Sequence, residues 1–241
     1  MNDSTSTAWW QLLRAGNVFT AISNILAGFL LVRGEWQPVL PLIFLILSSA
    51  ALYLAGMVLN DVFDLEADRV QRPERPLPSG RIDPSLAKLV GWGLMIDGLS
   101  AAAVAAWLLA SCLPIIVALL LAAAIISYDA LLKKTMLGPL AMGVCRSLNV
   151  LLGASVVLQS TDKNAAYLYA LLLGIYTIGL TLLARKEAES ARIQKYVSLM
   201  ITLFIPFDAL ACAAGAGWPA GLTVFLLLIP TYIATRRAPM T

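Results

Sequence analysis

Residues 38–68 read PVLPLIFLILSSAALYLAGMVLNDVFDLEAD, an apolar run long enough to cross a bilayer that ends in a group of aspartates. Every backbone N–H and C=O inside a bilayer needs a partner within the chain, and an apolar run of about 20 residues meets that need only as a helix. The stretch therefore predicts a membrane-spanning helix over 38–60 whose C-terminal end presents carboxylates.

Seven more apolar runs of similar length accompany this one. With 60% hydrophobic and 13% charged residues and a mean hydropathy of +0.82, the chain has about half the charged share of a soluble protein. This composition excludes disordered, collagen-like and ordinary cytosolic proteins. We predict an all-α polytopic membrane helical bundle of about eight transmembrane helices, one domain over residues 1–241, with the other spans at 8–32, 84–110, 113–132, 136–158, 165–184, 194–214 and 218–235.

The distribution of lysine and arginine predicts the orientation. Two basic residues, Arg33 and Lys163, lie on one side of the predicted spans, and twelve lie on the other: Arg69, Arg72, Arg75, Arg81, Lys133, Lys134, Arg185, Lys186, Arg192, Lys195, Arg236 and Arg237. Basic loops stay in the cytoplasm, so we expect both termini there. No transit peptide precedes the first span, which favours an integral multi-pass protein of a bacterial inner membrane.

Composition also narrows the chemistry. The chain has no histidine, which excludes imidazole metal sites and His-based catalytic triads. Its three cysteines lie in separate apolar runs without paired spacing, so neither a disulfide framework nor a zinc site is expected. The net charge of +3 is spread over loops. We therefore expect no nucleic-acid partner and no obligate protein partner, with membrane lipid as the surroundings.

The aspartates after the second span are the first candidate site. At 100° per residue, Asp61, Asp64 and Asp68 fall within an arc of about 60° on a helix, and Asn60 lies about 40° beyond. Three carboxylates on one stripe at a membrane boundary repel one another and call for a cation. Carboxylate and amide oxygens favour a hard ion such as Mg²⁺. The alternative is a solvated helix end whose charges only mark the interface.

A basic loop follows the aspartates, and its arginines are interleaved with residues that break helices. Guanidinium groups beside a carboxylate–magnesium cluster suit a diphosphate, since they bind phosphate oxygens bidentately and Mg²⁺ bridges them. The same arginines also enforce the topology. The residues concerned are Arg69, Arg72, Arg75 and Arg81, with Pro73, Pro76, Pro78 and Gly80 between them.

The pattern Asn60-Asp61-x-x-Asp64-x-x-x-Asp68, followed by RPLPSGR at 75–81, resembles the first signature of the UbiA superfamily of membrane prenyltransferases. The resemblance extends over about residues 10 to 200 and implies transfer of an isoprenyl group from an isoprenyl diphosphate to an aromatic or other lipid-soluble acceptor. It implies Mg²⁺ as the cofactor, held by Asp61, Asp64 and Asp68, which would be the catalytic and metal-binding residues.

Other positions are similar to the family's substrate-binding residues. YDALLKK at 128–134 resembles its Tyr-Ser-x-x-Leu-Lys element, with Asp129 in place of serine and Lys133 on the diphosphate. Gly153 is expected to allow a close helix approach. An arginine at position 146, in the middle of a span, needs a partner or a bound anion, and a structural pair with Asp97 or Asp208 is the alternative. The resemblance assigns substrate binding to Arg14, Asn17, Asn60, Arg72, Arg75, Tyr128, Lys133, Arg146, Asn149, Glu187 and Glu189.

The chain departs from the family in two places. Where members have a second Asp-x-x-x-Asp motif after span six, this chain has ARKEAESAR at 184–192, so that a second Mg²⁺ is in doubt and Arg185 or Lys186 could replace its charge. Glu187 and Glu189 are about 200° apart on a helix and cannot easily share one ion. Members also typically have nine spans, whereas eight are predicted here.

Three functions follow from these residues. The first is a Mg²⁺-dependent membrane prenyltransferase, in which Asn60 orients the aspartates and apolar walls keep water from the allylic cation. The second is a non-enzymatic carrier or binding protein for an isoprenoid or aromatic metabolite on the same fold. The third is a CDP-alcohol phosphotransferase, which needs an Asp-Gly-x-x-Ala-Arg signature. Asp97-Gly98 is followed by LSAA, so this signature is absent.

Overall fold

A computed structural model describes residues 3–156, 164–187 and 190–235, and all the regular elements in these ranges are helical. The α-helices are α1 (Asp3–Leu13), α2 (Val18–Arg33), α3 (Val39–Phe63), α4 (Leu65–Gln71), α5 (Pro84–Leu108), α6 (Leu113–Ser127), α7 (Gly138–Ala154), α8 (Asn164–Ala184), α9 (Ala191–Thr202), α10 (Phe204–Ala216), α11 (Trp218–Phe225) and α12 (Leu228–Thr235). A 3₁₀ turn, η1 (Ala15–Asn17), precedes α2, and a π-helical turn, η2 (Tyr128–Leu132), follows α6.

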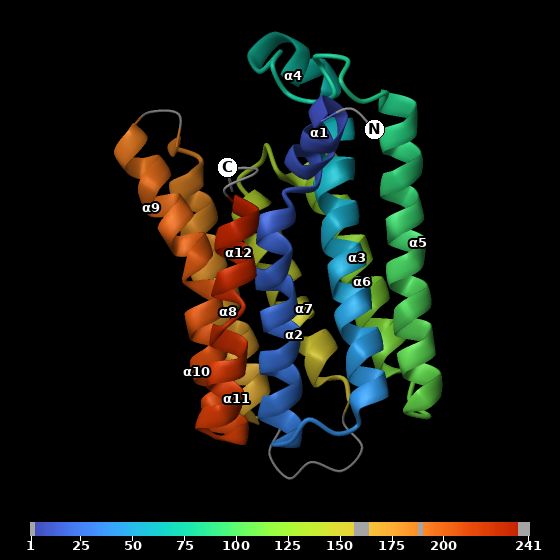
Figure 1. The fold of residues 1–241 in the computed structure, drawn as a ribbon, viewed down its shortest axis with the longest axis vertical. Coiled ribbons are helices and arrows are strands. Elements are labelled where there is room, and N and C mark those ends of the chain that lie inside the picture. Colours follow the sequence, from blue (N-terminus) through green and yellow to red (C-terminus); the bar gives the residue numbers. More distant parts are fainter. Residues whose placement is uncertain (1–2, 157–163, 188–189, 236–241) are drawn as a thin grey trace.

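The long helices run side by side, and α4 lies across one end of the bundle (Figure 1). Seven helical segments in the described residues are long and apolar enough to cross a membrane: 15–33, 39–63, 84–108, 113–132, 164–184, 191–216 and 218–235. The 17-residue helix α7 is shorter than these segments, and it packs against α2, α6 and α8 as a further helix of the bundle. The predicted all-α bundle of about eight transmembrane helices is confirmed.

The first span differs from the continuous helix expected over 8–32. The chain breaks at Arg14, which has left-handed backbone angles (φ 44°, ψ 48°), and continues through η1 into α2. A non-glycine residue adopts this conformation at a cost. The Arg14 guanidinium in turn lies 3.2 Å from the Asp61 carboxylate on α3, so a contact between distant residues accompanies the break.

The last two spans are also divided, and proline explains both divisions. A proline ring clashes with the carbonyl group four residues earlier. Pro206 and Pro230 stand four residues after Thr202 and Leu226, which lie where α9 and α11 end. The helix axis therefore restarts as α10 and as α12.

The ends of the described chain meet at the α4 end of the bundle. Thr235, the last residue of α12, lies against Gly16 of η1. The 72–83 loop is tied to α1 because Arg81 donates a hydrogen bond to the Gln11 side chain at 3.0 Å. The described chain therefore begins and ends at the same end of the bundle, while the cytoplasmic placement of the termini and the identity of the membrane stay predictions.

Two glycines set the distance between α2 and α7. A Cβ atom on Gly28 would collide with the carbonyl oxygen of Val150, and a Cβ on Gly153 would collide with the carbonyl oxygen of Ile25. The backbones therefore cross in direct contact, as small residues allow between membrane helices. This crossing brings the polar side chains of α7 next to those of α2.

We expect Gly153→Val to destabilise the protein by at least about 2 kcal/mol, because the new side chain must displace the α2 backbone. The thermal unfolding midpoint of detergent-purified protein measures the effect. Gly179→Val is the matched control, since a Cβ at Gly179 of α8 meets nothing within 4 Å. Equal midpoints for the two variants would contradict the close crossing.

Candidate functional site

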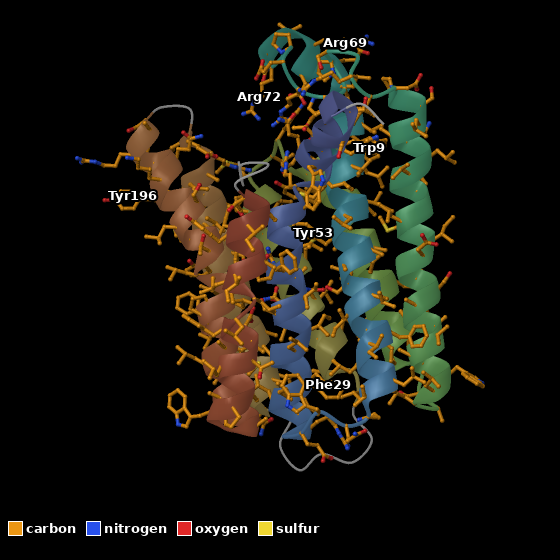
Figure 2. The ribbon with its side chains drawn as sticks, viewed as in Figure 1. Trp9, Phe29, Tyr53, Arg69, Arg72 and Tyr196 are labelled. Atoms are coloured by element: carbon orange, nitrogen blue, oxygen red, sulfur yellow. The ribbon has the colours of Figure 1, made fainter. Side chains whose placement is uncertain are left out.

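A cavity of about 320 Å³ lies inside the bundle among α2, α3, α6, α7, α8, α9 and α10. Ser49 and Asn60 of α3 both line it, and eleven residues of helix separate them by about 16 Å. The Tyr53 side chain, also in the cavity wall, lies between α2 and α3 midway along the bundle (Figure 2). The cavity therefore extends from the aspartate end of α3 toward the middle of the bundle.

The predicted aspartate stripe forms at the junction of α3 and α4. Asp64 caps α3 with near-helical backbone angles (φ −89°, ψ −1°), so Asp61 and Asp68 stay on its side of the chain. Asp61 and Asp68 are buried. Arg75 joins them, with its Nη1 atom 3.5 Å from Asp61 Oδ1 and 2.7 Å from Asp68 Oδ2.

Two further predicted cations reach the same stripe from other helices. Arg14 Nη2 lies 3.2 Å from Asp61 Oδ1, and Lys133 Nζ lies 2.7 Å from Asp64 Oδ2. The Asn60 side chain links the two pairs, because its Nδ2 donates to Asp61 Oδ1 at 3.3 Å and its Oδ1 accepts from Lys133 Nζ at 3.1 Å. The structure thus brings together residues that the sequence places far apart.

The remaining arginines of the loop lie at the surface. Arg72 is exposed at the end of α4, and Arg69 forms an exposed pair with Glu66 at 2.8 Å (Figure 2). Neither lines the cavity. Arg72, predicted to bind substrate, therefore stands outside the buried cluster.

The deeper half of the cavity contains Arg146. Its Nη1 donates to Asn24 Oδ1 at 2.8 Å and its Nη2 to Thr20 Oγ1 at 3.0 Å, and the guanidinium lies 4.3 Å from the Phe204 ring centroid. Within the described residues, Arg146 has no carboxylate at ion-pair distance. Its unused N–H groups can therefore serve a ligand in the cavity.

Asp208 is the buried carboxylate nearest to this arginine in the hydrogen-bond network. It accepts hydrogen bonds from Ser23 at 2.5 Å, Asn24 at 2.7 Å and Tyr169 at 2.6 Å. The alternative of a direct Arg146–Asp208 pair is therefore replaced by a link through Asn24. Asp97 lies exposed on α5 and contributes nothing to it.

Asn149 closes the deep end of the cavity. Its amide donates to the Ala21 carbonyl at 2.9 Å, and its side-chain oxygen accepts from Ser49 at 2.7 Å. Asn17 and Tyr128, two more predicted substrate-binding residues, line the wall nearer to the aspartates.

The segment after α8 does not replace the second acidic motif in a simple way. Glu187 lines the cavity, whereas Glu189 lies outside the described residues. The Arg185 side chain donates to the carbonyl oxygens of Lys133 and Thr135 and is not part of the cavity wall. The expectation that Arg185 supplies the missing charge gains no support from this geometry.

The sequence alone did not reveal the network around Asp208. Asn24, Ser23 and Thr20 are polar residues within an apolar span, and their spacing along one helix was an available signal. In the sequence, Asp129 is only a departure from the family pattern. It is buried and lines the cavity.

The donor set suits a hard cation. In the described part of the chain no three acidic or cysteine side chains are grouped as a metal site, and each aspartate of the stripe is paired with a lysine or arginine. Two buried carboxylate oxygens, Oδ1 of Asp64 and Oδ2 of Asp129, nevertheless lack a hydrogen-bond partner. Carboxylate oxygens together with the Asn60 amide match the ligands that Mg²⁺ prefers.

We expect Arg75→Ala to lower the free energy of unfolding by about 3 kcal/mol, because two buried carboxylates lose their shared cation. Arg69→Ala, which breaks an exposed pair, is the control and is expected to cost less than about 1 kcal/mol. Thermal unfolding in detergent measures both. If the two variants melted alike, Arg75 would not be the bridge between Asp61 and Asp68.

The sequence is similar to a known family and to several characterised proteins. Residues 21–238 match the UbiA prenyltransferase family. A digeranylgeranylglyceryl phosphate synthase of Saccharolobus solfataricus is 36% identical over 129 residues, which are 53% of this chain and 44% of that protein. One of Metallosphaera sedula is 32% identical over 145 residues, 59% of this chain and 49% of that protein. The matches thus span less than half of these relatives.

Solved structures share the fold. A structure described as a digeranylgeranylglyceryl phosphate synthase in membranes aligns with a TM-score of 0.64 at 22% identity, covering 96% of this chain and 85% of the other. A UbiA homologue from Archaeoglobus fulgidus bound to DMAPP and Mg²⁺ aligns with a TM-score of 0.62 at 16% identity, covering 95% of this chain and 85% of the other. Identities this low support the shared architecture alone.

Proposed function

The chain belongs to the UbiA prenyltransferase family, and we propose that it transfers an isoprenyl group from a polyprenyl diphosphate to a hydrophobic, aromatic acceptor in a Mg²⁺-dependent reaction. The observation that supports this most is the convergence of three aspartates with Arg14, Arg75 and Lys133 beside one cavity. The relative from Archaeoglobus fulgidus was solved with a prenyl diphosphate and Mg²⁺.

The diphosphate binds at the aspartate end of the cavity in this proposal. Asp61, Asp64 and Asp68 would hold Mg²⁺, which when bound would supply Lewis-acid stabilisation of the departing pyrophosphate. Arg14, Arg75 and Lys133 then exchange their carboxylate partners for phosphate oxygens. The pairs present without substrate hold these cations where the diphosphate needs them, which lowers the reorganisation needed on binding.

The allylic cation and the acceptor meet within the cavity. Met57, Leu121, Ile125 and Leu180 line it and exclude water, which would otherwise capture the cation. Arg146 lies in the same wall and is the group best suited to an acidic substituent of the acceptor. The named relatives are synthases of a glyceryl phosphate lipid, so a phosphate-bearing acceptor belongs in any substrate panel.

A carrier function on the same fold is the second candidate. It is favoured by one observation: the second acidic motif is replaced by a segment whose arginine points to backbone carbonyls outside the cavity. Such a protein binds a prenyl diphosphate or an aromatic metabolite without cleaving it. Turnover separates the two candidates.

The purified protein is expected to release pyrophosphate from geranyl, farnesyl or geranylgeranyl diphosphate when Mg²⁺ and an acceptor are present. The panel holds aromatic acceptors and geranylgeranylglyceryl phosphate. Asp64→Asn is expected to lower the rate by at least about 100-fold, because one charged ligand of the leaving group's counter-ion is lost. Glu66→Gln is the control, since Glu66 is exposed and away from the stripe.

Full activity of Asp64→Asn would overturn the assignment of the stripe. No release by the unaltered protein with any donor, together with diphosphate binding seen by calorimetry, would overturn the transferase and establish the carrier.

A further inference from the structure

Asp129 is a buried carboxylate for which the proposed reaction has no role yet. It is 4% exposed, lines the cavity, and its Oδ2 atom has no hydrogen-bond partner. Among Asp61, Asp64, Asp68 and Asp129, it is the one without an ion pair in the described part of the chain. A buried carboxylate without a counter-charge is costly, so the site calls for a ligand that neutralises it.

The π-helical turn η2 explains how Asp129 reaches the cavity. Tyr128 and Asp129, which are neighbours in the sequence, both line the wall, while Leu131 is 71% exposed on the other side. Such a turn adds a residue to the helix and commonly occurs at functional sites. Lys133 follows η2 directly and forms an ion pair with Asp64. The turn therefore places both a cation and a carboxylate at the aspartate end of the cavity.

The cations near Asp129 form ion pairs with other aspartates. Lys133, Asp64, Arg14 and Asp61 are the charged side chains that act most strongly on its carboxylate. Lys133 is paired with Asp64 at 2.7 Å, and Arg14 with Asp61 at 3.2 Å. Both cations therefore already have a carboxylate partner, and Asp129 makes no ion pair of its own among the described residues.

We propose that Asp129 binds a divalent cation together with Asp64 and so supplies the carboxylate that the segment 184–192 lacks. The inference rests on the proposed function, because diphosphate oxygens complete the coordination. Magnesium in enzymes is commonly held by one or two carboxylates plus substrate phosphates, so two aspartates are enough. Two carboxylate oxygens are offered to it: Oδ1 of Asp64, which has no hydrogen bond and only the exposed Lys134 at 3.7 Å as an ion-pair partner, and Oδ2 of Asp129, which has no hydrogen-bond partner.

The test counts bound Mn²⁺, an EPR-visible substitute for Mg²⁺, on the full-length protein in detergent with inorganic pyrophosphate present. The unaltered protein is expected to bind two ions. Asp129→Asn and Asp129→Ser are expected to bind the second ion about 10- to 100-fold more weakly and to keep the first. Asp97→Asn, on the exposed face of α5, is the control and is expected to match the unaltered protein.

Thermal unfolding without metal separates a ligand from a structural residue. Asp129→Asn is expected to be as stable as the unaltered protein or more so, since an uncompensated charge is removed, and to gain less stability from added Mn²⁺ with pyrophosphate. A metal-free Asp129→Asn that is markedly less stable would overturn the proposal.

The outcomes also separate this inference from the proposed function. Unchanged Mn²⁺ binding in both Asp129 variants would overturn the role of Asp129 even if pyrophosphate release by the unaltered protein were normal. Two bound ions falling to one in the variants, with no pyrophosphate release by the unaltered protein, would support the cation site and overturn the transferase.

Discussion

Neutralisation of buried carboxylates is the constraint on which the arrangement of this protein depends. Asp61 at the end of α3 and Asp68 in α4 are buried, and burial removes the solvation by water that a carboxylate needs. Their counter-charges come from Arg14 before α2 and Arg75 in the loop after α4, while Lys133 after η2 serves Asp64. Three segments that are distant in the sequence therefore converge on one end of a cavity.

Buried charges in the middle of the bundle are also neutralised, but there by hydrogen bonds to neutral side chains and not by ion pairs. Arg146 and Asp208 do not touch, because Asn24 accepts from the first and donates to the second. The contact between the α2 and α7 backbones at Gly28 and Gly153 makes this possible, since Asn24 and Arg146 lie near that crossing. Every charged group in this network is hydrogen-bonded, yet Arg146 still faces the cavity.

Much of the site was predictable because its residues are local. The stripe of Asp61, Asp64 and Asp68 follows from helical periodicity, and the structure keeps it through the helical backbone of Asp64. Arg14 was identified by resemblance, but the break in the helix at that residue was not, because it accompanies a contact with Asp61 47 positions away. Asp129 was read as a substitution for serine, and its missing partner is visible only when its neighbours are in place.

By itself, the sequence determined the membrane-spanning helices, the family and the carboxylate stripe, because hydropathy and helical spacing are properties of neighbouring residues. Only the tertiary structure decided which cation pairs with which aspartate and that Asn24 stands between Arg146 and Asp208. It also decided that Oδ2 of Asp129 has no hydrogen-bond partner among the described residues. These depend on pairings between helices, and in a medium of low dielectric constant such pairings are set by which charges lie within a few ångströms of one another.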